Sequence, residues 1–151
     1  MFAQLLKRMT AAEVPPANAD EMQHAVAVLL VEAARMDDHF DEAERTVIER
    51  LLAEKFALSP EEIRQLLIRA ETTAKQSSQL HPFTRLAVTR MSPEQRVRLI
   101  EMLWEVVYAD GVLDPEEDVL LRRVAGLIYV SDEDRVAARR RVLARLGRNS
   151  G

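Results

Sequence analysis

Apolar side chains recur along this chain every three or four residues, the spacing that places them on one face of an α-helix. Two segments, 19–37 and 93–110, are apolar over most of their circumference. Such helices belong inside a bundle. The stripe in the first segment consists of Met22, Val26, Leu29, Ala33 and Met36, and the stripe in the second of Val97, Ile100, Leu103, Trp104, Val106 and Val107.

Helix start signals divide the rest of the chain. Ser59, Ser92 and Asp114 are each followed by proline and, three residues after the capping residue, by Glu or Gln. This pattern caps the first turn of a helix. Asp41 and Ser131 begin weaker versions without proline. The signals predict helices at about 2–11, 19–37, 42–57, 60–76, 82–90, 93–110, 115–129 and 132–146. No segment alternates as a strand would, so the predicted fold class is all-α.

We expect one compact domain, residues 1–151, built as a bundle of about seven to eight helices with its core at about 20–146. A domain of this length buries roughly 68–70% of its unfolded surface, so it needs no disulfide. The chain has no cysteine, which excludes thiolate metal sites and cysteine nucleophiles. The first helix carries Phe2, Leu5, Leu6 and Met9 on one side. We expect it to dock on the bundle, with peripheral attachment to a membrane as the alternative.

Charge and hydropathy restrict the partners and the cellular location that the sequence predicts. The formal net charge of −4 argues against a nucleic-acid partner. No apolar run reaches the ~18 residues of a transmembrane segment. The first residues lack a secretory signal, and we predict a cytoplasmic protein. The last helix is basic, and we interpret its arginines as a solvated face, with an acidic partner or a phosphate as the alternative. These arginines are Arg135, Arg139, Arg140, Arg141, Arg145 and Arg148.

Two parts of the chain correspond at a constant offset of 73 residues. Apolar matches, such as Val26 with Leu99, carry little weight. Acidic matches at identical spacing are less expected by chance, and they pair Glu32 with Glu105, Asp37 with Asp110, Asp41 with Asp114 and Glu44 with Glu117. We predict two pseudo-repeated halves, at about 22–76 and 95–146, that close into one bundle. An open solenoid would need at least three repeats.

The repeated acidic unit has the form Asp-x-x-x-Asp-x-x-Glu. Its second Asp and its Glu have a structural explanation as helix cap and capping-box partner. Its first Asp does not, because it ends a helix, where the dipole disfavours an anion by roughly 0.3–1 kcal/mol. A bound cation, a salt bridge or a bond to the next helix would explain it. The candidate metal ligands are Asp37, Asp41, Glu44, Asp110, Asp114 and Glu117.

All these ligands are oxygen donors, which suit Mg²⁺ or Ca²⁺ and argue against zinc or copper. One copy holds too few carboxylates for tight Ca²⁺ binding, whereas two copies facing each other would supply enough. The spacing is not that of an EF-hand. Glu32 and Glu105 lie inside the most apolar helices, and we expect each to pair with an arginine, such as Arg50 or Arg123.

The second acidic segment, Tyr108 to Glu117, reads YADGVLDPEE, and the first, Asp37 to Glu44, reads DDHFDEAE. These segments resemble the TerB-like family of bacterial tellurite-resistance proteins, over roughly residues 20–145. The resemblance implies an all-helical fold whose two halves bring acidic loops together, a divalent-metal site, and a role in stress response or in membrane-associated complexes. Asp38 stands where the second copy has Gly111 and tolerates a left-handed backbone less well, which argues against two identical loops.

Catalytic patterns are absent from the sequence. Three histidines show no metal-ligand spacing, no nucleophile lies in a recognisable triad, and there is no phosphate-binding glycine loop. We therefore assign no catalytic residue and no organic cofactor. We expect a non-enzymatic binding module that recruits a protein partner, responds to Mg²⁺ or Ca²⁺ and, by resemblance, serves tellurite or general stress resistance. The alternatives are a metal-dependent hydrolase with carboxylate-held Mg²⁺ and a plain helical scaffold.

Overall fold

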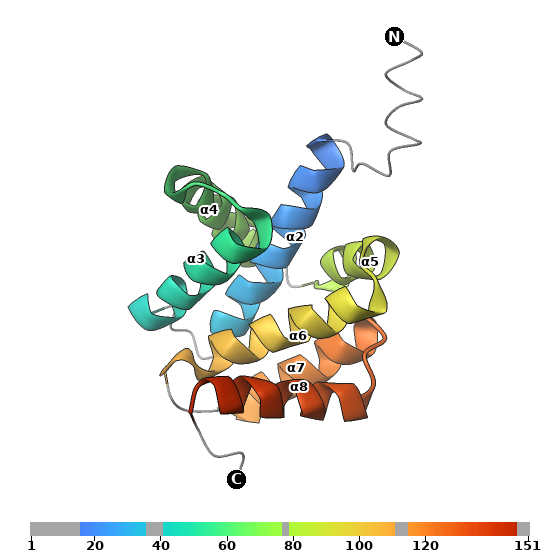
Figure 1. Ribbon diagram of the computed structural model, residues 1–151. Coiled ribbons are helices and arrows are strands. Elements are labelled where there is room, and N and C mark those ends of the chain that lie inside the picture. Colours follow the sequence, from blue (N-terminus) through green and yellow to red (C-terminus); the bar gives the residue numbers. More distant parts are fainter. Residues whose placement is uncertain (1–15, 36–40, 77–78, 111–114, 148–151) are drawn as a thin grey trace.

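The computed structural model describes residues 16–35, 41–76, 79–110 and 115–147. Every regular element within these ranges is a helix (Figure 1), which confirms the all-α fold class. The elements are α2 (Pro16–Ala34), α3 (Glu42–Phe56), α4 (Pro60–Gln76), α5 (His81–Arg90), α6 (Pro93–Val107), the 3-10 helix η1 (Tyr108–Asp110), α7 (Pro115–Leu127) and α8 (Asp132–Arg145). The helix predicted at 2–11 lies outside the described residues.

Local capping fixes most of the helix starts. Asp41 and Ser92 accept hydrogen bonds from the backbone N–H groups of Glu44 and Gln95, and both capping boxes are complete. Ser59 forms the same reciprocal pair with Glu62, with bonds of 2.9 and 3.2 Å. The predicted boundaries hold to within one turn. Helix α2 begins at Pro16, earlier than predicted, because proline fits the first position of a helix.

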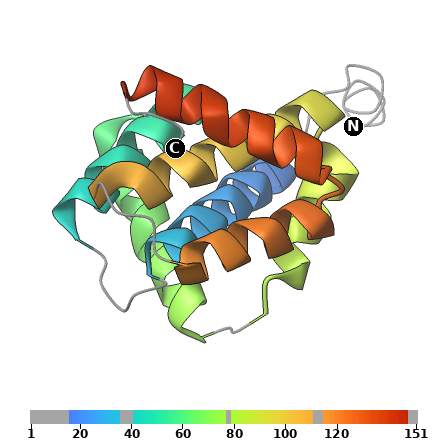
Figure 2. The same ribbon diagram turned by 90° about the horizontal axis from the view of Figure 1, so that it is seen from below.

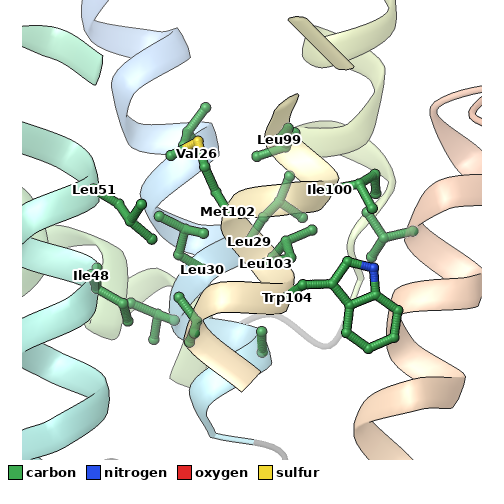
Figure 3. Packing of buried hydrophobic residues seen from close by; sticks show 14 of the residues in the cluster. Val26, Leu29, Leu30, Ile48, Leu51, Leu99, Ile100, Met102, Leu103 and Trp104 are labelled. Carbon is green, nitrogen blue, oxygen red and sulfur yellow. The ribbon is translucent and has the colours of Figure 1, made fainter. Parts of the chain in front are cut away.

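Two helices form the centre of the bundle. Every residue of α2 from Ala25 to Val31 is buried, and α2 contacts α3, α4, α5, α6 and α7 (Figure 2). Helix α6 is buried almost throughout its second half, from Leu99 to Trp104 and at Val106 and Val107. Figure 3 shows Ile48 and Leu51 of α3 on one side of α6 and Trp104 on the other. The apolar stripes predicted from the sequence are therefore core, except that Met22 and Val97 are only partly buried against it. Met36 lies outside the described residues.

The remaining helices pack around this pair. Helix α4 packs on α2, and α8 packs on α6 (Figure 1). Helix α5 contacts α2 and α7. The packing of α4 on α2 in the first half corresponds to that of α8 on α6 in the second, as expected if the two halves are related. The duplication itself stays a prediction. None of the described helices combines the length and the apolar character that a bilayer crossing needs.

Two helices end in a left-handed residue that is not glycine. Ala57, after α3, has φ 53°, and Tyr129, after α7, has φ 60°. Around Tyr129 the N–H of Val130 reaches the carbonyl of Ala125 (2.8 Å) and the N–H of Tyr129 reaches Gly126 (3.3 Å). This is the Schellman arrangement, in which glycine is preferred at the position of Tyr129. Tyr129 is 77% exposed, so its ring adds little packing there.

We expect Ala57→Gly and Tyr129→Gly each to raise the free energy of unfolding by about 1 kcal/mol, because glycine adopts the left-handed conformation without a Cβ clash. Urea denaturation followed by circular dichroism measures the change. Ala137→Gly, in the middle of α8, is the matched control, and it should lower stability by roughly 0.5–1 kcal/mol. Destabilisation in all three variants would contradict the left-handed geometry.

Candidate functional site

The ends of four helices meet on one side of the bundle, where the two acidic segments begin and end. Figures 1 and 2 show the C-terminal ends of α2 and α6 beside the N-terminal ends of α3 and α7. Helix α2 contacts α7, and η1, which continues α6, contacts α3. Each acidic segment therefore starts beside the helix that the other segment leads into.

The structure describes only part of the predicted ligand set. Asp37 and Asp114 lie outside the described residues, and of Asp110 only the backbone, at the end of η1, is described. Asp41 caps α3 through a 2.9 Å bond from the N–H of Glu44, and the Glu44 carboxylate accepts the N–H of Asp41 at 3.2 Å. The structural roles predicted for Asp41 and Glu44 are therefore confirmed.

The two glutamates of the acidic repeat are both buried. Glu44 is only 1% exposed and Glu117 only 3%, although both lie in the first turn of a helix. A capping-box glutamate needs no such burial, because its bond is made at the helix end. A buried carboxylate has to be compensated by hydrogen bonds or a cation. Both side chains are thus buried in the first turns of α3 and α7, on the side where the ends of the four helices lie together.

The described side chains alone do not complete a metal site. Among them no group of three or more histidine or acidic side chains is placed to hold one ion. The donors described on this side are carboxylate oxygens, the chemistry that Mg²⁺ and Ca²⁺ select. The full set of the prediction includes Asp37, Asp110 and Asp114, whose side chains lie outside the described residues.

An ionic cluster joins α3, α6 and α8, and it corrects the interpretation of α8 as a solvated basic face in part, because Arg140, Arg141 and Arg145 stay exposed while two of them pair with α6. Glu101, 7% exposed, accepts hydrogen bonds from Arg141 (3.1 Å) and Arg145 (2.8 Å). Arg145 also donates to Glu105 (2.8 Å), which in addition accepts a 2.6 Å bond from Arg50 of α3. Arg141 and Arg145 stay about half-exposed, and their guanidinium groups reach two acidic side chains that α6 presents one turn apart.

Glu101 was not recognised in the sequence. It lies within the apolar stripe of α6, between Ile100 and Met102, where a charged residue breaks the pattern. Its spacing of four residues from Glu105 matches that of Arg141 from Arg145, which is the signal that could have identified the cluster. Arg135, also predicted to be solvated, is 8% exposed and pairs with Asp132. Arg148 lies outside the described residues.

Glu32 and Glu105, at matched positions of α2 and α6, have different surroundings. The prediction that Glu105 pairs with an arginine is confirmed, and its partners are Arg50 and Arg145. Burial raises the pKa of Glu105, but the bonds from Arg50 and Arg145 outweigh it and hold the pKa below its usual value. Glu32 lies 3.8 Å from Arg35 rather than near Arg123, and burial raises its pKa with only partial compensation. Arg123 is exposed on α7 and pairs with neither glutamate.

Helix α8 also fixes the start of η1. The Nε of Arg139 donates a 2.6 Å hydrogen bond to the hydroxyl of Tyr108, the first residue of η1. The same guanidinium lies over the rings of Trp104 and Tyr108, at 5.8 and 5.9 Å. The entry into the second acidic segment is therefore held by contacts from a helix that the sequence motif does not include.

Comparison with protein families shows where the chain belongs. The family described as tellurite resistance protein TerB matches residues 23–140, which is most of the chain and includes both acidic segments. No curated protein and no solved structure matches the chain.

Proposed function

The chain belongs to the tellurite resistance protein TerB family, and from this premise we propose that it is a non-enzymatic binding module whose acidic segments respond to Mg²⁺ or Ca²⁺. The module recruits a protein partner in the response to tellurite or to a general stress. The observation that carries the proposal is the burial of Glu44 and Glu117 on the side where the ends of four helices meet.

The mechanism is electrostatic. Carboxylates that converge repel one another, and a divalent cation relieves that repulsion through oxygen coordination. The carboxylates that would coordinate the cation are those of Glu44, Glu117, Asp37, Asp110 and Asp114. Since η1 contacts α3 and α2 contacts α7, a cation at this side would fix the two halves relative to each other. A partner that binds across both halves would then bind the cation-loaded form more tightly, because that form already holds the two halves in one arrangement. The ion favours this form only to the extent that it binds it more tightly than the cation-free arrangement.

Titration of MgCl₂ and CaCl₂ into chelator-treated protein tests the cation response. We expect one of the two ions to raise the melting temperature and to shift backbone amide signals of η1 and of the first turns of α3 and α7 in NMR spectra. The double variant Asp37→Asn, Asp110→Asn should lose both responses. Asp134→Asn, an exposed residue in the first turn of α8, is the matched control and should keep them.

Unchanged melting temperatures and amide shifts with both ions would overturn the cation response and leave a helical scaffold. The partner is tested separately, by pull-down from the native cell with and without chelator. Proteins captured by the native chain but lost both with chelator and with the double Asn variant would support recruitment. Growth of a deletion strain on tellurite and under other stresses then tests the physiological setting.

A further inference from the structure

A pocket lies at the ends of α3 and α6 that are opposite to the acidic segments. It forms where α2, the last turn of α3, the end of α5 and the first turn of α6 meet, and it has a volume of about 290 Å³. That volume is near the lower end of small-ligand pockets, roughly 300 Å³. The lining residues are Met22, Gln23, Lys55, Phe56, Arg90, Met91 and Gln95. We refer to it as the Lys55 pocket.

The Lys55 pocket is cationic in an acidic protein. The net charge of the chain is −4, yet Lys55 and Arg90 line this pocket and no carboxylate does. The pocket between α2 and α4 differs, because Asp20, Glu61 and Glu62 are among its lining residues. An anion entering the Lys55 pocket therefore meets opposite charge without a like charge in the wall.

Lys55 carries a half-buried charge without a carboxylate partner among the described residues. Its ammonium lies 5.7 Å from the centre of the Phe56 ring, and the charge that acts on it is that of Arg98. Burial and then the Arg98 guanidinium lower the pKa of Lys55. Arg45, also half-buried on α3, instead pairs with Glu71 at 3.1 Å. Burying a charge without pairing is unfavourable, so a bound anion would relieve a cost that the fold leaves in place.

The rest of the lining suits an apolar group beside the anion. Met22, Phe56 and Met91 provide apolar surface, and methionine adapts to ligands of irregular shape. The carbonyl oxygen of Gln95 accepts the N–H of Ser92 at 2.8 Å, which leaves the amide NH₂ of Gln95 as a donor. The pocket thus combines a cation, amide donors and apolar side chains within a small volume.

We propose that the Lys55 pocket binds a carboxylate attached to an apolar chain or ring, with the carboxylate on Lys55 and the apolar group against Met22, Phe56 and Met91. The ligand is a free organic acid or the carboxyl terminus of a peptide that ends in an apolar residue, since both present the same chemistry. The site is separate from the acidic segments, so it stands independently of the cation response.

Titration of ¹⁵N-labelled protein with octanoate tests the proposal. We expect saturable shifts of the amides of Met22, Phe56, Met91 and Gln95, and binding of octanol about tenfold weaker because it lacks the charge. Lys55→Met should weaken octanoate binding by about tenfold while keeping the melting temperature close to that of the native chain. Lys75→Met, the same change in the last turn of α4, is the matched control and should bind as the native chain does.

A second arm of the experiment distinguishes a free organic acid from the carboxyl terminus of a peptide. An acetylated peptide ending in a free leucine carboxylate is compared with its amidated form. Binding of octanoate alone identifies a free organic acid, and binding of the free-acid peptide in preference to the amide identifies a chain terminus. Arg90→Gln, at the exposed end of α5, provides a second variant that should weaken either ligand. Absence of binding in both arms, or equal binding by Lys55→Met and Lys75→Met, overturns the proposal.

Discussion

Trp104→Ala is expected to lower the free energy of unfolding by about 3–5 kcal/mol, the usual loss for a large aromatic side chain in a core. Trp104 is 1% exposed and is among the largest fully buried side chains described. Its ring stacks on Tyr108 at 5.8 Å, and the guanidinium of Arg139 lies over it. Truncation therefore removes the surface on which α8 packs and also loosens Tyr108 at the start of η1.

Trp104→Phe is the control for this prediction. The indole N–H of Trp104 is buried without a hydrogen-bond partner among the described residues, so phenylalanine removes no hydrogen bond. We expect a smaller loss, about 1–2 kcal/mol, because the phenyl ring keeps part of the aromatic packing and leaves a smaller cavity than alanine does. Urea denaturation has to be followed by far-UV circular dichroism, since the chain has a single tryptophan and both variants remove it. A loss below about 1 kcal/mol for Trp104→Ala would contradict the packing of α6 against α8.

Glu105→Gln is expected to lower the free energy of unfolding at neutral pH by about 1–3 kcal/mol. The Glu105 side chain is 12% exposed and accepts charge-assisted bonds from Arg50 and Arg145. Hydrogen bonds to charged groups contribute about 1.5–3 kcal/mol, and we reduce their sum because solvent screens the half-exposed arginines. The variant keeps the shape of the side chain and removes its charge, so the loss reports the ion pairs that join α3, α6 and α8.

The effect of Glu105→Gln on the free energy of unfolding should depend on pH, and its direction follows from the pKa of Glu105. The pKa of Glu105 in the folded chain lies below its usual value of 4.5, despite burial, because of Arg50 and Arg145. The contribution of ionised Glu105 to the free energy of unfolding is therefore complete above pH 4.5 and is lost as the pH falls through the folded-state pKa. The difference between the native chain and Glu105→Gln should shrink as the solution is acidified. Unfolding free energies measured across the acidic range provide the test.

Glu32→Gln is the matched variant, at the corresponding position of α2, and its effect should have the opposite sign. Burial raises the pKa of Glu32 above 4.5, and Arg35 at 3.8 Å offsets this only in part. Ionisation of Glu32 therefore favours the unfolded chain as the pH rises through the window between 4.5 and the raised value. Glutamine should stabilise the folded chain at neutral pH. Equal losses in both variants would show that amide substitution, rather than charge, causes the effect.

Helix positions were predictable because the interactions that set them are local. The capping boxes at Asp41, Ser59 and Ser92 each join residues three positions apart, so they can be read directly from the sequence. The burial of α2 and α6 follows from their apolar circumference. The motif repeated at Glu44 and Glu117 likewise identified the segments and the family.

The degree of burial at the candidate site was not predictable. A glutamate in the first turn of a helix is usually solvated, and nothing near Glu44 or Glu117 in the sequence indicates otherwise. Their burial depends on which helix ends meet, and η1 contacts α3 across the stretch of chain that holds α4, α5 and α6. The sequence therefore identified a repeated set of acidic residues, while the packing placed two of their side chains inside.

The sequence by itself determined the helices, their apolar faces and the family, since periodicity and caps act within a few residues of one another. The tertiary structure decided which charges pair. Glu101 meets Arg141 and Arg145 across 40 and 44 residues of chain, whereas Lys55 meets no carboxylate among the described residues. The physical reason is that the strength of an ion pair depends on distance and on exclusion of water, and both are set by the packing of distant helices rather than by local spacing.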